Sequence, residues 1–189
     1  MARFSRAGEE VRYTGPLISV ATGTYRAPDG SSFERDVVHH PGAVSVVPVV
    51  EDGAADAPAV LLVRQYRSAV DRELLEIPAG KRDVAGEDPA TTAERELAEE
   101  VGMRAGEITR LAEFFNSPGF CDEHSFVFMA RAMEACGIDA QGIEEEHMTV
   151  ERVALAEVPG LIAEGRIVDA KTIIGLCLAR ETLAGTVRP

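Results

Sequence analysis

A helix near the middle of the chain, over residues 89–101, has the clearest signals in the sequence and most constrains the fold. Asp88 is a typical N-cap residue, Pro89 fits the first helical position, and Gly102 fits the position just after the helix. With about 100° of rotation per residue, one face carries an apolar stripe made of Ala90, Ala93, Leu97 and Val101. Such a stripe must pack on another surface, so the helix predicts a sheet beneath it.

Apolar runs on both sides of this helix predict the strands of that sheet. The strand candidates are 43–50, 59–66, 108–115, 124–130 and about 147–153. Two further helices are expected, one over 155–164 with an interruption at Pro159-Gly160, and one over the apolar segment 168–184. Strands and helices mixed in this order predict an α+β fold, in which helices cover a sheet.

The first forty residues read as a separate β region. Two strand-like runs flank Asp29-Gly30, a dipeptide that is typical of hairpin turns. The region has few apolar residues for its length, so it needs another surface to pack on. Cyclic dimers are the commonest oligomers, and packing across a two-fold dimer would supply that surface. We therefore divide the chain into an N-terminal β region, residues 1–40, and a main domain, residues 41–189.

The chain is strongly acidic, with 32 acidic against 19 basic residues and a net charge of −13. This charge argues against a nucleic acid or an anionic membrane as partner, because neither surface would attract the protein. No apolar run approaches the roughly 18 residues of a membrane span. The first residues also lack the apolar core of a signal peptide. We therefore expect a cytoplasmic protein with no membrane partner.

Three glutamates crowd the central helix in the stretch RELAEEVG, residues 95–102. Glu96 and Glu100 are four residues apart with Glu99 between them, and only Arg95 can pair along the helix, with Glu99, which leaves Glu96 and Glu100 facing each other. Like charges at this spacing destabilise a helix by roughly 0.2–0.5 kcal/mol per pair. A solvated face is the ordinary explanation of a charge run, but such a face normally interleaves Lys or Arg. A divalent cation would turn the repulsion into binding, and carboxylates on a rigid helix suit Mg²⁺ or Mn²⁺.

The segment 80–103 resembles the sequence signature of the Nudix hydrolase family. That signature is a glycine, five residues, a glutamate, seven residues, and then Arg-Glu-aliphatic-x-Glu-Glu-x-Gly-aliphatic. The residues that fill it here are Gly80, Glu87, Arg95, Glu96, Leu97, Glu99, Glu100, Gly102 and Met103. The spacing from Gly80 to Glu87 departs from it, with six intervening residues in place of five. Loops absorb insertions at small cost, so the signature stands, but the insertion leaves the role of Glu87 open.

This resemblance implies a Mg²⁺-dependent hydrolase, with Mn²⁺ as a substitute, that cleaves a nucleoside diphosphate linked to another group. The implied metal ligands within the segment are Glu96, Glu99, Glu100 and the backbone carbonyl of Ala79. Glu99 is also a candidate catalytic residue. The residues implied to be structural are Gly80, Arg95 and Gly102, and Arg95 would hold a glutamate of the signature in place. The implied fold is a Nudix-type α/β/α sandwich with a mixed sheet, preceded by an antiparallel N-terminal sheet.

A proline beyond the signature points to one subfamily. Pro118 lies sixteen residues after Gly102, where ADP-ribose pyrophosphatases of this family carry a proline. The neighbouring Gly119, the upstream segment ELLEIPAG and the N-terminal sheet are similar too, so the resemblance covers about residues 31–180. The implied reaction converts ADP-ribose, or a related ADP-sugar, to AMP and a sugar phosphate, and the implied assembly is a homodimer. Two alternatives stay open, namely another nucleoside diphosphate sugar such as GDP-mannose and a non-catalytic ligand sensor.

The remaining candidates are arginines and a second acidic cluster. Arg67, just past a strand, is a candidate for contacting the diphosphate, and Arg64 and Arg35 are weaker ones. Each could equally be a surface ion-pair partner, which contributes little. Pro118 and Gly119 are also expected to contact substrate.

The second acidic cluster is GIEEEHM, residues 142–148. Most acidic triplets are merely solvated, but in this subfamily a loop at about this place supplies a catalytic carboxylate. Glu144 is the leading candidate for the base and Glu146 for a further metal ligand. Their neighbour Glu145 leaves the assignment open by one or two positions.

Overall fold

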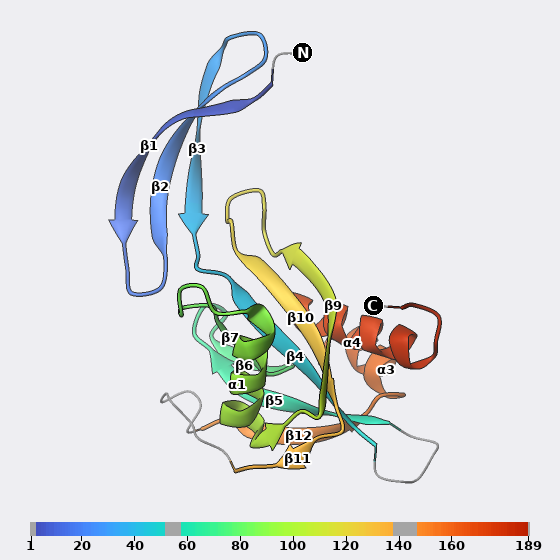
Figure 1. Cartoon of the computed structure of the whole chain (residues 1–189). Helices are drawn as coiled ribbons and strands as arrows, with labels where there is room; N and C mark the ends of the chain where they lie inside the picture. Colours follow the sequence, from blue (N-terminus) through green and yellow to red (C-terminus); the bar gives the residue numbers. More distant parts are fainter. Residues whose placement is uncertain (1–2, 52–57, 138–146, 189) are drawn as a thin grey trace. The chain divides into compact units, whose positions relative to one another are not determined.

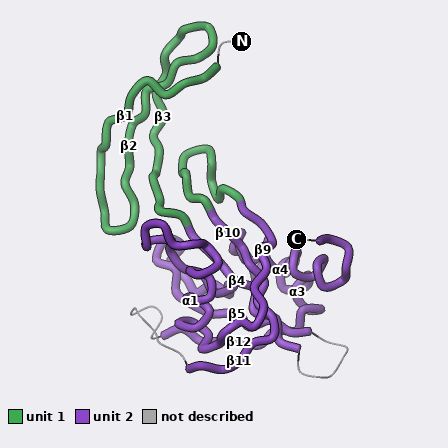
Figure 2. The backbone as a smooth tube through the Cα atoms, in the orientation of Figure 1, with its two compact units in different colours: residues 1–42, 114–124 green, residues 43–113, 125–189 purple. Residues whose placement is uncertain are grey.

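The computed structural model describes residues 3–51, 58–137 and 147–188 (Figure 1). The chain forms two compact units by its contacts (Figure 2). Met1–Gly42 and Phe114–His124 make up unit 1, and Ala43–Glu113 and Ser125–Pro189 make up unit 2. The segment 114–124 thus joins residues that precede it by more than seventy positions, which no local pattern in the sequence indicates. The predicted domain boundary at residue 40 stays a prediction.

Unit 1 contains an antiparallel sheet of β1 (Ser5–Thr14), β2 (Ser19–Arg26) and β3 (Ser32–His39). The sequence prediction of an N-terminal β region is therefore confirmed. At the turn between β2 and β3, Gly30 has a φ of 87°, a conformation that glycine adopts without strain. Asp29 accepts a hydrogen bond from the Ser31 N–H at 2.9 Å, which closes the predicted hairpin.

The sheet of unit 1 buries little apolar surface by itself. Ala21 is fully buried, but every residue of β1 is exposed. Val11 and Tyr13 on that strand are 59% and 55% exposed. Large apolar side chains that are exposed to this extent mark surfaces suited to further packing.

Unit 2 is built on a mixed sheet. Its strands are β4 (Ala43–Val50), β5 (Ala59–Arg67), β6 (Arg72–Glu76), β7 (Ala79–Lys81), β9 (Glu107–Phe115), β10 (His124–Arg131) and β12 (Thr149–Ala154). Their order is β12-β5-β4-β10-β9, with β6 paired to β5 and β7 paired to β4. β4 and β10 run parallel, whereas β5 is antiparallel to β4, β6 and β12. A separate ribbon joins β8 (Met103–Arg104) and β11 (Glu134–Ala135).

Helices cover both faces of this sheet. They are α1 (Pro89–Val101), α3 (Val158–Ala163) and α4 (Ala170–Leu183). Val44 and Val46 of β4 pack in one apolar cluster with Leu97 of α1. Val47 instead lies against α4, where a Cβ on Gly175 would meet its side chain at 3.0 Å. Because side chains alternate along a strand, α1 and α4 lie on opposite faces, and the predicted α/β/α sandwich is confirmed.

The ends of the helices follow from local chemistry. Asp88 caps α1 by accepting a hydrogen bond from the Ala90 N–H, and Gly102 ends it with a φ of 69°. One expectation needs correction, because α3 begins only at Val158 and continues through Pro159 and Gly160. A proline in the first turn lacks only an N–H that has no helical partner there, so it starts this helix and does not interrupt it. No helix in the described ranges is long and apolar enough to cross a membrane.

Candidate active site

The register of α1 places two glutamates at the edge of its buried face. Ala93 and Leu97 are fully buried in the apolar cluster under the helix. Glu96 and Glu100 adjoin that stripe and are only 8% and 4% exposed. Carboxylates are rarely buried to this extent unless they are paired or bind a metal. These two glutamates therefore do not belong to an ordinary solvated helix face.

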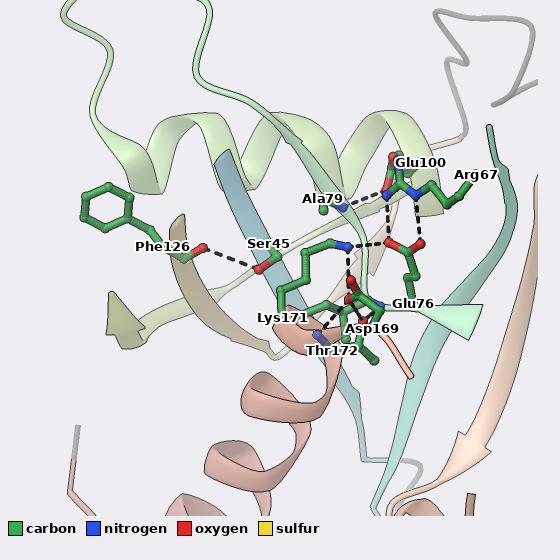
Figure 3. Close-up of polar contacts among 10 residues, drawn as sticks. Ser45, Arg67, Glu76, Ala79, Glu100, Phe126, Asp169, Lys171 and Thr172 are labelled. Atoms are coloured by element: carbon green, nitrogen blue, oxygen red, sulfur yellow. Dashed lines mark hydrogen bonds and ion pairs between the residues drawn. The ribbon is translucent and has the colours of Figure 1, made fainter. Parts of the chain in front are cut away.

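The short strand β7 brings the other predicted metal ligand to these glutamates. The Ala79 N–H donates a hydrogen bond to Glu100 Oε2 at 3.0 Å (Figure 3). A Cβ atom on Gly80 would lie 1.9 Å from Cδ of Glu96, so the carboxylate occupies the space that only glycine leaves. The structure thus brings Ala79, Glu96 and Glu100 together, and it gives Gly80 a steric reason for its place in the signature.

Arg95 lies among three carboxylates of the signature. One of its Nη1–H groups faces Glu96 Oε1 and another faces Glu99 Oε2, each at 3.0 Å. Its Nη2 is 3.8 Å from Glu87 Oε2. Burial lowers the pKa of Arg95, but the charges of Glu96, Glu99 and Glu87 outweigh it and raise that pKa. The guanidinium therefore stays charged and holds these side chains, as the predicted structural role requires.

Glu87 reaches the helix despite the extra residue in the preceding loop. Its Oε2 accepts a hydrogen bond from the Thr92 hydroxyl at 2.6 Å, in addition to its approach to Arg95. Thr92 is buried, so this contact fixes the loop against the first turn of α1. The insertion has therefore not removed Glu87 from the group of carboxylates.

This set of side chains fits a divalent cation. We define the box cluster as Glu87, Arg95, Glu96, Glu99 and Glu100, a set of four carboxylates and one guanidinium. Arg95 contacts the first three carboxylates, and Glu100 accepts from the Ala79 N–H. Hard carboxylate oxygens beside a backbone carbonyl are the donors that Mg²⁺ and Mn²⁺ prefer. Within the described ranges, no three Asp, Glu, His or Cys side chains are arranged as a ready metal site. Contacts with Arg95 and the Ala79 N–H occupy these carboxylates, so a metal ion would have to replace some of them.

Arg67, the leading diphosphate candidate, is held by a buried glutamate. Its Nε and Nη2 donate to the two carboxylate oxygens of Glu76 at 2.8 and 2.7 Å (Figure 3). The hydrogen bond to Glu76 is the main cause that raises the pKa of Arg67, and the charge of Glu100 adds to it. Arg67 therefore lies near the box cluster in a fixed orientation, about a third of its side chain still being open to solvent.

The two weaker arginine candidates have other partners. Arg64 donates to Glu151 at 2.5 Å, across the pairing of β5 with β12. Arg35 belongs to unit 1, where it donates to the Glu34 carbonyl at 2.7 Å and lies 4.9 Å from the centre of the Phe33 ring. Neither contact prevents a role in binding, and both roles stay predictions.

Pro118 and Gly119 lie in a turn of unit 1 that is attached to β3. The Phe120 N–H donates to the Ser117 carbonyl at 3.1 Å, which closes the turn. The Val38 N–H in turn donates to the Phe120 carbonyl at 2.7 Å. The turn therefore has a defined conformation within its own unit, and its contact with substrate stays a prediction.

His39, at the end of β3, holds the segment that follows this turn. Its Nδ1 is 2.5 Å from Asp122 Oδ2 and its Nε2 is 2.8 Å from Glu9 Oε1. The hydrogen bond with Asp122 is the main cause that raises the pKa of His39. A histidine between two carboxylates is favoured in its charged form. His39 thus connects β1, β3 and the Pro118 turn.

The three glutamates proposed for the second acidic cluster, Glu144, Glu145 and Glu146, lie outside the described residues. Their roles stay predictions. The sequence reading missed a different group, the buried ion pairs of Glu76. Glu76 stands between the apolar residues Leu75 and Ile77, and such an isolated charge in an apolar strand was the available signal.

A comparison with known protein families decides whether this site belongs to a Nudix hydrolase or to a non-catalytic ligand sensor. A family model described as NUDIX domain matches residues 39–174. The chain belongs to the Nudix family. It is therefore a Nudix hydrolase, and the resemblance read from the signature is confirmed. Enzymes of this family generally use divalent metal ions, which agrees with the donors of the box cluster. The reading as a non-catalytic ligand sensor loses its support.

Individual relatives and a solved structure agree with this assignment. The ADP-ribose pyrophosphatase of Bacillus subtilis is 35% identical over 164 residues, which cover 87% of this chain and 85% of that protein. The ADP-ribose pyrophosphatase of Mycobacterium tuberculosis is 34% identical over 186 residues, which cover 98% and 87%. A GDP-mannose pyrophosphatase of Enterobacter is 32% identical over 123 residues, which cover 61% and 63%. The crystal structure of an ADP compounds hydrolase matches 99% of this chain and 97% of its own, with a TM-score of 0.83 at 23% identity, which shows the fold.

Proposed function

We propose that this Nudix hydrolase cleaves ADP-ribose, or a related ADP-sugar, into AMP and a sugar phosphate with the help of Mg²⁺. The proposed substrate rests on the similarity of this chain to two ADP-ribose pyrophosphatases over at least 85% of their length. The box cluster supports metal-dependent hydrolysis, because its excess of carboxylates fits a divalent cation. Water would attack one phosphorus of the diphosphate, the bridging P–O bond would break, and the products of ADP-ribose would be AMP and ribose 5-phosphate.

The residues of α1 and β7 hold the metal in this proposal. Glu96, Glu100 and the Ala79 carbonyl are the main ligands, and Glu99 and Glu146 join them. A bound Mg²⁺ would neutralise the diphosphate and lower the pKa of a coordinated water. The remaining signature residues position these ligands, because Arg95 neutralises part of their charge and Gly80 leaves room for Glu96.

Other side chains act on water and substrate in this proposal. Glu144 orients or deprotonates the attacking water, a role that a positioned carboxylate performs well. Arg67 contacts the diphosphate from the orientation that Glu76 imposes, with Arg64 and Arg35 as weaker candidates. The turn with Pro118 and Gly119 contributes to substrate binding. Nucleoside diphosphate sugars are thus the proposed partners.

A substrate panel tests this function. The purified chain is assayed on ADP-ribose, GDP-mannose, NADH, diadenosine polyphosphates and nucleoside triphosphates, with Mg²⁺ and separately with Mn²⁺. We expect ADP-ribose to give the highest kcat/KM, and chelation of the metal to abolish turnover. Nucleoside triphosphates preferred by tenfold, or about 1.4 kcal/mol, would contradict the proposal. GDP-mannose is the second candidate because a GDP-mannose pyrophosphatase is similar over 61% of the chain, and its preference would identify that alternative.

A homodimer and a cytoplasmic location complete the proposal. The exposed apolar side chains Val11 and Tyr13 of unit 1 support a dimer, because a second copy would bury them. Light scattering at micromolar concentration should give about twice the 20.3 kDa of one chain. A fully active monomer would contradict the dimer without affecting the proposed reaction.

A further inference from the structure

Each residue of the segment 76–79, which runs from the end of β6 to the start of β7, contacts another element of unit 2. The Pro78 carbonyl accepts a hydrogen bond from the Val46 N–H at 2.9 Å, and the Ala79 N–H donates to Glu100 at 3.0 Å. These contacts come from β4 and α1, which already form the site. Glu76 is held by Arg67 of β5 and also by Lys171 in the N-terminal turn of α4, and the Ile77 N–H donates to Thr172 in the same turn. That turn supplies none of the proposed metal ligands.

A relay of hydrogen bonds connects that turn to Ile77. Asp169 caps α4 by accepting from the Thr172 N–H at 2.9 Å, and it also accepts from the Thr172 hydroxyl at 2.6 Å. Because a hydroxyl has one proton, the bond to Asp169 leaves its lone pairs free to accept. One of them accepts the Ile77 N–H at 3.0 Å. Thr172 and Ile77 are both fully buried, so water cannot replace this bond.

Ion pairs and packing hold the same stretch. Lys171 pairs with the fully buried Glu76 and lies 3.0 Å from Asp169. The Ile77 side chain lies under α4 where the helix has Gly175, since a Cβ there would be 3.0 Å from Ile77 Cδ1. Residues of α4 therefore contact the backbone and side chain of Ile77 and the carboxylate of Glu76, which Arg67 holds as well, two to three residues before Ala79.

We propose that the N-terminal turn of α4 is a positioning element for the metal site, and that Thr172 and Lys171 set the position of the Ala79 carbonyl through Ile77 and Glu76. This inference rests on the proposed metal-dependent function. Groups that orient a metal ligand without touching the metal typically contribute 10- to 100-fold in metal affinity or activity. Thr172 and Lys171 are thus positioning residues, and the proposal does not make them ligands.

Mn²⁺ binding to the full-length, metal-free protein tests the proposal without turnover. Free Mn²⁺ is titrated by electron paramagnetic resonance against wild type, Thr172→Val and Thr172→Ser. We expect Thr172→Val to raise the Kd for Mn²⁺ by about 10-fold or more, whereas Thr172→Ser keeps the hydroxyl and stays near wild type. A merely structural role would lower the melting temperature of Thr172→Val and leave the Kd of the folded protein unchanged, which would overturn the proposal.

A charge-matched pair of variants gives a second test, which remains decisive if Thr172→Val does not fold. Lys171→Met and Arg180→Met each remove one positive charge from α4, at its first and last turn. Electrostatics alone predicts tighter Mn²⁺ binding when a nearby cation is removed. A positioning role predicts weaker Mn²⁺ binding instead. Lys171→Met should therefore raise the Kd for Mn²⁺ several-fold, while Arg180→Met leaves that Kd near the wild-type value. Unchanged or tighter binding by Lys171→Met would overturn the inference.

Measurements on the wild-type protein distinguish failure of the proposed function from failure of the positioning role of α4. Wild type that binds no Mn²⁺ and hydrolyses no nucleoside diphosphate sugar would overturn the proposed function itself. Wild type that binds Mn²⁺ and hydrolyses ADP-ribose, with variants of equal Mn²⁺ affinity, would overturn only the positioning role of α4.

Discussion

Two clusters of charge lie close together in unit 2, and they differ in how their charge is balanced. The box cluster has four carboxylates and one cation, Arg95, which contacts three of them. The buried ion group, which we define as Arg67, Glu76, Asp169 and Lys171, has two carboxylates and two cations. Both clusters lie at the border of the core, where an unbalanced charge is costly. The buried ion group is thus balanced by its own members, whereas the box cluster has more carboxylates than cations among its members, a composition that suits a divalent cation.

The same contrast appears in how the negative charge of the carboxylates is neutralised in each cluster. Burial tends to raise the pKa of Glu76, but its hydrogen bond with Arg67 and the charge of Lys171 outweigh burial, so that pKa is lowered. Glu76 therefore keeps its charge without any ligand. In the box cluster, Arg95 contacts three carboxylates at once and can neutralise only one of them. Variants of the two clusters test this difference.

Removal of a proposed metal ligand should have the largest effect. We expect Glu100→Gln to lower turnover on the order of 10³-fold, because groups one step removed from a metal already contribute 10- to 100-fold. The Kd for Mn²⁺ should rise in parallel. Glu94→Gln is the matched control, because Glu94 lies on the exposed face of the same helix. Turnover by Glu100→Gln within a few-fold of that control would remove Glu100 from the metal site.

Loss of the catalytic base should lower turnover and leave substrate and metal binding nearly unchanged. We expect Glu144→Gln to lower turnover by at least about 10²-fold, the usual contribution of a positioned base, with KM and the Kd for Mn²⁺ near normal. Gln variants of Glu145 and Glu146, assayed at saturating Mg²⁺, decide whether the assignment shifts along the loop. If none of the three loses more than a few-fold, the base lies elsewhere, with Glu99 and Glu123 as the next candidates.

The chain sequence predicts the box cluster better than the buried ion group, for a physical reason. The box cluster lies mostly on one helix, so its register follows from a period of about 3.6 residues and from the caps Asp88 and Gly102. The buried ion group joins Arg67 and Glu76 to Lys171, 95 residues after Glu76, and no local pattern reports such a pairing. The central helix was therefore predictable in its bounds and its buried face.

The Pro118 turn shows the same limit. The sequence marks Ser117 to Gly119 as a turn, and the turn is present. Its attachment to β3 through Val38, and the contact of Asp122 with His39, join segments about eighty residues apart. Such contacts depend on tertiary packing, which single-sequence patterns do not report. The grouping of this turn with the N-terminal sheet was therefore not predictable from its own residues.

Breaking the balanced cluster should lower the stability of the fold. We expect Glu76→Leu to lower the free energy of unfolding by about 3–5 kcal/mol, because it leaves Arg67 and Lys171 without their buried partner. Glu151→Gln is the control, because its pair with Arg64 is about a third exposed and should contribute about 0–1 kcal/mol. Urea unfolding of both variants measures the difference. Equal losses would show that the balance of the buried ion group is not what stabilises it.

The smallest expected effect concerns a third ionic group, in unit 1, whose cation can lose its charge. His39 faces Glu9 and Asp122, and the hydrogen bond with Asp122 is the main cause that raises its pKa above the ordinary 6.5. A raised folded-state pKa means that the charged His39 stabilises the fold fully below about pH 6.5. That stabilisation is then lost as pH rises through the raised value.

His39→Gln tests this dependence, because glutamine keeps a polar side chain but does not titrate. The difference in free energy of unfolding between wild type and His39→Gln should be largest near pH 5 to 6 and should shrink as pH rises further. Burial tends to raise the pKa of Asp122, but the hydrogen bonds from His39 and the His40 N–H and the charge of His39 together outweigh burial and lower that pKa, so the carboxylate stays charged across this range. In an Asp122→Asn background, the effect of His39→Gln on the free energy of unfolding should therefore lose most of its pH dependence. In a His147→Gln background, which changes an exposed histidine, that pH dependence should be the same as in wild type. A difference that grows with pH would have the wrong sign for a charged His39, and the ionic attachment of the Pro118 turn would then have to be abandoned.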